Sequence, residues 1–83
     1  SSALMRAHLL TELTRLQQEG SQFVSAETFS GWTNYFKKEM KIKGKPLFKG
    51  MRLILTGRIS GGDLSALIPM TPIDVLVERL KAV

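Results

Sequence analysis

The sequence predicts an all-α fold, a compact bundle of about five helices in a single domain. Apolar residues recur at intervals of three and four positions in successive stretches of the chain, which is the spacing of one helix face. Capping residues and glycines lie at the ends of these stretches. The chain has 83 residues, 43% of them hydrophobic, which is enough for one small core and too few for two domains.

The first helix is expected over residues 2–18. Its apolar face comprises Met5, Leu9, Leu13 and Leu16. Gly20 follows the last of these residues, in a position where a glycine commonly ends a helix. The second helix should begin after Ser25, whose hydroxyl can cap its N-terminus, and should end near Lys41.

Aromatic residues dominate the second helix. Together with a methionine they recur at helical spacing, as Phe29, Trp32, Phe36 and Met40. Aromatic side chains can stack on nucleic-acid bases, but this regular spacing favours a role in the core. Val24 precedes the capping residue and is positioned to pack on Phe29 as a hydrophobic staple.

A third helix is expected after the basic turn at residues 43–45. Pro46 should be its first residue, because the first helical position needs no N–H donor, and Gly57 should end it. One face of this helix is apolar and holds Leu47, Met51 and Ile54. The opposite face holds Lys45, Lys49, Arg52 and Thr56. The helix should therefore present a basic surface opposite its buried side.

Two shorter helices are expected after a glycine-containing loop. Asp63 can cap a helix from Leu64 to Ile68, which Pro69 should close. Thr71 can cap a last helix whose first residue is Pro72. The core that these helices share is expected to contain Leu9, Leu13, Phe29, Trp32, Phe36, Met51, Ile54, Leu55, Leu76 and Leu80.

Positive charge is concentrated in one segment of the chain. The formal net charge is +5. Residues 37–58 contain eight lysines and arginines and a single acid, whereas the rest of the chain contains four basic and six acidic residues. Such segregation is expected of a surface that binds a polyanion. A solvated, lysine-rich surface would have the same composition, so the count alone leaves both interpretations open.

Catalysis and metal binding are not expected within these residues. The chain has no cysteine, which excludes disulfides, thiolate zinc sites and cysteine nucleophiles. His8 is the only histidine and has no partner at ligand spacing, so a surface position is favoured over a catalytic role. No apolar run approaches the roughly 20 residues of a transmembrane helix, and no secretory signal is recognisable. A soluble, cytoplasmic protein is therefore expected.

The basic face of the third helix and the loop after it form the candidate site. Lys43, Lys45 and Lys49 can neutralise RNA phosphates. The planar guanidinium of Arg52 can hydrogen-bond to an unpaired base or stack on it. The loop from Arg58 to Gly62 contains two glycines, so its main chain can approach a base closely. Together these features favour the binding of unpaired RNA.

The segment at residues 43–57 resembles a motif of bacterial glutamyl-tRNA synthetases. It runs Lys-Gly-Lys-Pro-Leu-Phe-Lys-Gly-Met-Arg-Leu-Ile-Leu-Thr-Gly, similar to Lys-Gly-Lys-x-Leu-Phe-x-x-x-Arg-x-x-Leu-Thr-Gly in that family. A glycine-containing loop, a leucine-rich short helix and a last helix ending near Arg79 and Leu80 follow in the family's order. The resemblance covers Trp32 to Val83, whereas the residues before Trp32 fit by position and helical character. Gly61-Gly62 replaces the usual Gly-Pro.

The resemblance implies that residues 1–83 are the C-terminal anticodon-binding subdomain of a larger class I synthetase. In that family the motif arginine and the loop after the Thr-Gly pair contact the anticodon. The corresponding residues are Arg52, Arg58, Ile59, Ser60, Gly61, Gly62 and Leu64. The parent enzyme would use ATP and Mg²⁺ to activate glutamate and attach it to tRNA for glutamate, with tRNA for glutamine as a second candidate. The subdomain itself would need no cofactor and is expected to be monomeric.

The residues alone leave other functions open. A helical protein-interaction domain could use the same basic face to bind an acidic partner. A generic RNA-binding module, including a free-standing protein of the nucleoid or ribosome, would also carry such a face.

Overall fold

The computed structural model describes residues 2–82 and contains five α-helices joined by short loops. They are α1 (Ser2–Gln18), α2 (Ala26–Lys38), α3 (Gly44–Thr56), α4 (Leu64–Leu67) and α5 (Ile73–Lys81), with a 3-10 turn, η1 (Ile68–Met70), between the last two. Residues 2–82 contain no β-strand, so the predicted all-α fold of about five helices is confirmed. No helix in this range is long and apolar enough to cross a membrane.

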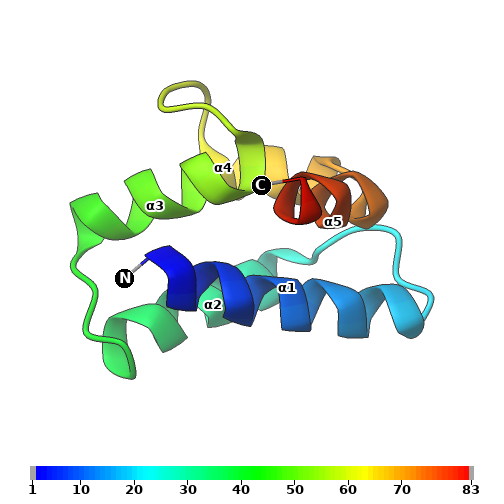
Figure 1. Cartoon of the computed structure of the whole chain (residues 1–83), viewed down its shortest axis with the longest axis horizontal. Helices are drawn as coiled ribbons and strands as arrows, with labels where there is room; N and C mark the ends of the chain where they lie inside the picture. Colours follow the sequence, from blue (N-terminus) through cyan, green and yellow to red (C-terminus); the bar gives the residue numbers. More distant parts are fainter. Residues whose placement is uncertain (1, 83) are drawn as a thin grey trace.

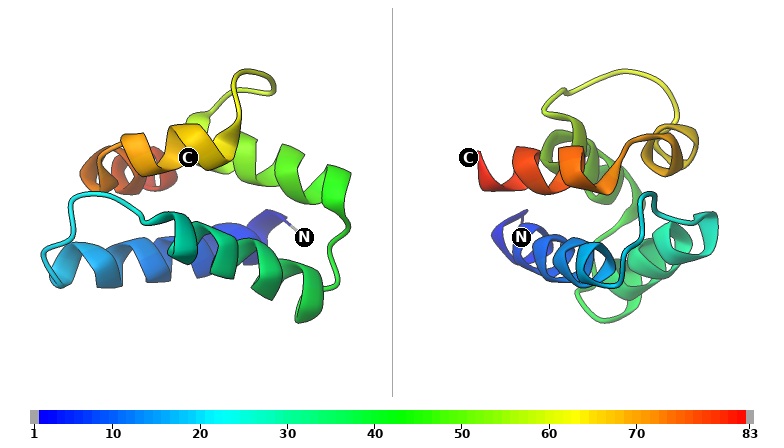
Figure 2. Two further views of the ribbon diagram at one scale, coloured as in Figure 1. Left: turned by 180° about the vertical axis from the view of Figure 1, so that it is seen from behind. Right: turned by 90° about the vertical axis from the view of Figure 1, so that its right-hand side faces the viewer.

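The helices are arranged in two layers (Figure 1, Figure 2). α1 and α2 run in opposite directions in one layer, and α3, α4 and α5 form the other layer. α5 packs against both α1 and α3, and η1 packs against α2. The loop of residues 57–63 projects outward from the second layer (Figure 1). The basic helix and its loop therefore lie on the side of the molecule opposite α1.

The core lies between the two layers and contains all ten residues predicted for it. Each of these ten has at most 4% of its surface exposed. Seven further apolar residues are equally buried, namely Met5, Val24, Leu47, Leu64, Ile68, Ile73 and Val77. Phe29, Trp32 and Phe36 are among the buried residues, so the core role favoured for the aromatic residues of α2 is confirmed.

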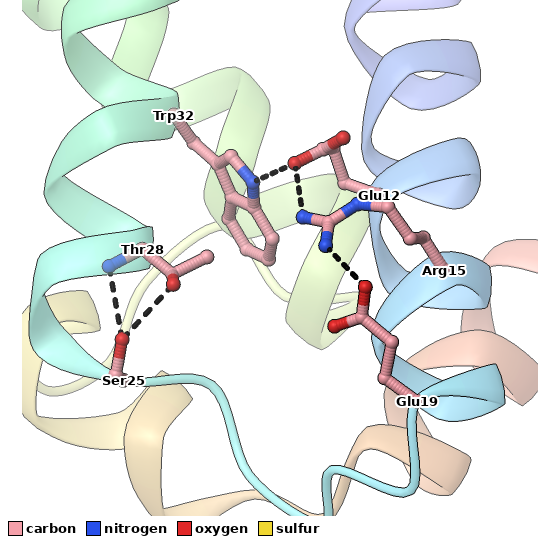
Figure 3. Close-up of polar contacts among 6 residues, drawn as sticks. All are labelled: Glu12, Arg15, Glu19, Ser25, Thr28 and Trp32. Carbon is pink, nitrogen blue, oxygen red and sulfur yellow. Dashed lines mark hydrogen bonds and ion pairs between the residues drawn. The ribbon is translucent and has the colours of Figure 1, made fainter.

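The predicted ends of α1 and α3 and the start of α2 agree with the structure. Gly20 and Gly57 both adopt left-handed backbone conformations, with φ of 85° and 72°, which glycine tolerates without steric cost. Ser25 is the N-cap of α2, and its Oγ accepts a hydrogen bond of 3.1 Å from the Thr28 backbone N–H (Figure 3). Local capping chemistry was therefore sufficient to place these boundaries.

The prediction that α2 continues to about Lys41 is wrong, because the helix ends at Lys38. Lys41 adopts a left-handed conformation, with φ of 57°, and reverses the chain. The Ile42 N–H then donates to the Phe36 carbonyl over 3.1 Å. Met40 still packs against the core, but it does so from this turn. Met40 continues the apolar spacing of the helix without belonging to it, and for this reason the predicted helix was too long.

The prediction that Pro46 is the first residue of α3 is also wrong, because the helix begins at Gly44. Lys43 is the N-cap, and its carbonyl accepts the first helical hydrogen bond from the Leu47 N–H at 2.8 Å. The three positions before Leu47 have no partner inside the helix, so the missing N–H of Pro46 costs nothing at the third position either.

Three predictions about the C-terminal third need correction. Pro69 does not close the fourth helix, because the helical path continues through it as η1. Thr71 does not cap the last helix, because its hydroxyl donates to the Leu67 carbonyl at 2.8 Å and so completes the preceding turn. Pro72 is not the first residue of the last helix but the N-cap of α5, which begins at Ile73, and its carbonyl accepts from the Leu76 N–H.

Candidate nucleic-acid interface

The outer face of α3 carries cations without carboxylate partners. Lys45 and Lys49 are exposed, and Arg52 is partly buried one turn further along. Within residues 2–82, the ion pairs join Arg15 to Glu12 and Glu19, and none involves α3. Because no acid neutralises this face in the described part of the chain, its positive charge is available to a polyanion.

A hollow of about 280 Å³ lies where α3 meets the loop of residues 57–63. It is lined by residues from α3, the loop, α4, the end of η1 and α5, namely Arg52, Thr56, Arg58, Ser60, Gly61, Gly62, Leu67, Thr71 and Arg79. We call it the loop hollow. It brings five of the predicted anticodon-contacting residues together and places three arginines on its walls.

Arg52 fixes the loop against α3. Its Nη1 donates to the Gly62 carbonyl over 2.7 Å, a bond that spans ten residues of sequence. This bond uses one of the five N–H groups of a guanidinium, which leaves the planar fork with donors for a ligand. Arg52 can therefore position the loop and contact a bound group at the same time.

The Thr-Gly pair at the end of α3 sets the direction in which the loop leaves the helix. The Thr56 hydroxyl donates to the Arg52 carbonyl at 2.7 Å and accepts from the Arg58 N–H at 3.1 Å. Gly57 supplies the left-handed conformation between them. The loop therefore starts with its backbone held by a side chain of the helix, which restricts the conformations it can adopt.

Gly61 has a backbone conformation that favours glycine, with φ of 149°. A Cβ atom added at this position would lie 3.3 Å from Nη1 of Arg52, which is closer than most such contacts. The glycine thus allows the loop to pass directly over the guanidinium. Gly62, which stands where the related motif has proline, supplies the carbonyl that Arg52 binds.

Two of the predicted anticodon-contacting residues lie outside the loop hollow. The Leu64 side chain has 3% of its surface exposed and belongs to the core, so only its backbone can face a ligand in this conformation. Ile59 is 80% exposed and lines a separate hollow of about 330 Å³ with Lys49, Gly50 and Leu53. The structure therefore leaves Leu64 only its main-chain groups for the predicted contact.

The predicted phosphate-contacting lysines extend from the start of α3. Lys43 is the exposed N-cap, whereas Lys45 and Lys49 line a third hollow of about 490 Å³ that also includes Phe48 and Arg52. Arg52 thus lines both this hollow and the loop hollow. Lys45 and Lys49 therefore lie next to Arg52, whereas Lys43 lies at the opposite end of α3 from the loop hollow.

Sequence reasoning did not assign a role to Arg79, which forms one wall of the loop hollow. Its Nη1 donates to the Leu55 carbonyl over 3.0 Å, so α5 is tied to the C-terminal end of α3. The family resemblance included the arginine of the last helix, and this was the one indication in the sequence that Arg79 could belong to the site. Its position beside Arg52 depends on how α5 packs on α3 and could not be derived from spacing.

The opposite side of the molecule holds a polar cluster whose groups satisfy one another (Figure 3). Glu12 accepts from Arg15 at 3.1 Å and from the Trp32 indole N–H at 3.3 Å. The hydrogen bond from Arg15 is the main reason that the pKa of Glu12 lies below its ordinary value. His8 stacks on Tyr35, with 4.3 Å between the ring centroids. No group of three or more potential metal ligands occurs within residues 2–82.

Comparison with known proteins identifies relatives of one enzyme class. The chain is 45% identical over 56 residues to glutamate–tRNA ligase 2 of Beijerinckia indica, which covers 68% of this chain and 11% of the relative. It is 33% identical over 78 residues to glutamate–tRNA ligase of Clostridioides difficile, covering 92% of this chain and 16% of the relative. It is also 48% identical over 44 residues to glutamate–tRNA ligase 1 of Chelativorans, covering 53% of this chain and 10% of the relative.

These matches confirm the resemblance found in the sequence. The chain spans only 10–16% of the length of the relatives reported above, so it corresponds to a segment of such proteins. No family model and no solved structure matches the chain. These relatives do not favour the alternative of a helical protein-interaction or generic RNA-binding module.

Proposed function

We propose that this chain, a relative of a segment of the glutamate–tRNA ligases, binds the anticodon loop of a tRNA as part of such an enzyme. The observation that carries the proposal is the loop hollow, which gathers Arg52, Arg58 and Arg79 next to an unneutralised row of lysines. Unpaired bases are recognised by planar donors and exposed main-chain groups, and RNA phosphates are bound by flanking cations.

The proposed roles divide between the hollow and the lysines. Arg52 holds the loop and offers its remaining N–H groups to a base edge, while Ser60, Gly61 and Gly62 offer main-chain groups around it. Lys43, Lys45 and Lys49 contribute phosphate contacts that are strong and independent of sequence. Discrimination between anticodons should therefore depend on the hollow, and total affinity should depend on both regions.

The parent protein would activate glutamate with ATP and Mg²⁺ and attach it to tRNA for glutamate, with tRNA for glutamine as a second candidate. These steps would take place in a part of the protein outside residues 1–83, which we propose to be its C-terminal anticodon-binding subdomain. We further propose that the protein is cytoplasmic and acts as a monomer.

Replacement of Arg52 by glutamine tests this proposal most simply. We expect Arg52→Gln to weaken binding of an RNA hairpin with the anticodon loop of tRNA for glutamate about tenfold, because a charged, bidentate contact to a base is lost. It should also reduce the preference for this hairpin over one with an unrelated loop. Fluorescence anisotropy titrations at one fixed salt concentration measure both quantities.

Arg15→Gln is the matched control, because it removes the same charge from α1 on the opposite side of the molecule. It should leave affinity within about twofold, since screening limits the effect of a remote exposed charge. Equal losses in the two variants would reduce the interaction to general electrostatic attraction. An unchanged affinity and preference in Arg52→Gln would contradict the proposed role of the loop hollow.

A further inference from the structure

An aromatic ring lies half-exposed among the cations of α3. Phe48 has 40% of its surface exposed, in contrast to Phe29, Trp32 and Phe36 of α2, which are buried. The Lys37 ammonium lies over the Phe48 ring, 5.7 Å from its centroid. Phe48 also lines the hollow of about 490 Å³ that contains Lys45, Lys49 and Arg52. We call this the ring hollow.

We propose that the ring hollow is a second RNA subsite, in which Phe48 stacks on the base next to the one bound at the loop hollow. The inference rests on the proposed function and gives a binding role to Phe48, a residue of the motif to which the sequence analysis assigned no contact. Proteins that bind single strands combine cationic grooves with aromatic rings, because every base offers a face for stacking.

The two hollows share one lining side chain. Arg52 lines both of them. Phe48 precedes Arg52 by four positions, which is about 6 Å along the axis of α3. A strand with one base at the loop hollow would therefore pass its neighbouring nucleotide over Phe48, with Lys45 and Lys49 beside its phosphate.

The charge around the ring supports a nucleotide as the occupant. Lys37, Lys45, Lys49 and Arg52 surround or line the ring hollow, and none of them forms an ion pair within residues 2–82. A purely apolar partner would have to desolvate these cations without compensation. A base with its phosphate meets both requirements, because the base covers the ring and the phosphate neutralises the lysines.

The other exposed apolar residues near the lysines do not have this geometry. Leu53 and Ile59 are 51% and 80% exposed and line the hollow that includes Lys49 and Gly50. Their side chains are aliphatic and provide no π face. Leu53 is therefore a matched control, since it is an exposed apolar residue of the same helix that should not stack on a base.

The test compares Phe48→Leu, Phe48→Tyr and Leu53→Ala in the full chain. The probe is the anticodon-loop hairpin of tRNA for glutamate, with the fluorescent base 2-aminopurine placed at successive loop positions. We expect Phe48→Leu to weaken binding about tenfold, the scale of one lost base–aromatic stack, and to abolish the stacking-induced quenching at one loop position. Phe48→Tyr should preserve both, and Leu53→Ala should bind within about twofold of the original chain.

Several results separate this inference from the proposed function. If Phe48→Leu binds and quenches like the original chain while Arg52→Gln is weakened, the second subsite is wrong and the loop hollow stands. If Phe48→Tyr loses as much affinity as Phe48→Leu, the ring does not act by stacking, which also overturns the inference. If neither Arg52→Gln nor Phe48→Leu changes binding, both proposals fail. Circular dichroism of each variant verifies that the helices are intact.

Discussion

The α1–α2 layer and the outer face of α3 both contain arginine and phenylalanine, but the surroundings of these residues differ. Arg15 on α1 is paired with two carboxylates, whereas Arg52 on α3 bonds to a loop carbonyl and borders two hollows. Phe36 is fully buried, whereas Phe48 is 40% exposed. The comparison shows that surroundings, and not residue type, separate the groups that stabilise the fold from those available to a ligand.

The two regions also differ in how much they contribute to the stability of the fold. A half-exposed phenylalanine and a row of unpaired lysines contribute little to folding. The Glu12–Arg15–Glu19 cluster, by contrast, satisfies its own charges and hydrogen bonds. A surface of the first kind is expected where binding a partner supplies the missing interactions.

The largest predicted contrast concerns the two phenylalanines. Phe36→Ala should lower the free energy of unfolding by about 3–5 kcal/mol, because it leaves a cavity in the packed core. Phe48→Ala should lower it by only about 1 kcal/mol, since much of the ring is already in water. Urea denaturation followed by circular dichroism measures both values. Equal losses would show that Phe48 is a core residue, and the comparison would break down.

A smaller contrast concerns two glycines. Gly31 lies inside α2, and a Cβ added there would meet nothing within 4 Å, so Gly31→Ala should stabilise the fold by up to about 1 kcal/mol. Gly61→Ala should destabilise it by about 1 kcal/mol, because the added Cβ crowds Arg52 at a φ that alanine rarely adopts. Thermal unfolding of the two variants gives the signs, and stabilisation by Gly61→Ala would contradict the close contact at Arg52.

The sequence was sufficient for those features that depend on local chemistry. Apolar spacing identified the core, and the glycines at positions 20 and 57 and the cap at Ser25 located helix ends. The basic face was recognisable because Lys45, Lys49 and Arg52 recur at helical intervals. Prolines were less informative, because Pro46 and Pro69 are tolerated at several positions near the start of a helical turn.

Features that depend on packing between helices could not be predicted. The family resemblance placed Leu64 among the anticodon-contacting residues, but it did not indicate that the Leu64 side chain is buried in the core. Arg79 reaches the loop hollow only because α5 crosses the end of α3. The exposure of Phe48 could not be predicted either. Phe48 lies beside the apolar stripe of α3, and its exposure depends on how α2 packs next to it.

Mapping the RNA-binding surface of the chain by nuclear magnetic resonance tests the central claim most directly. The isotopically labelled chain is titrated with the anticodon-loop hairpin of tRNA for glutamate while amide and arginine side-chain signals are followed. We predict the largest shifts at Arg52, Ser60, Gly61 and Gly62, and unchanged signals for residues 12–19 of α1 and the turn after it. Shifts spread equally over the lysines, and equal for any RNA, would contradict the account.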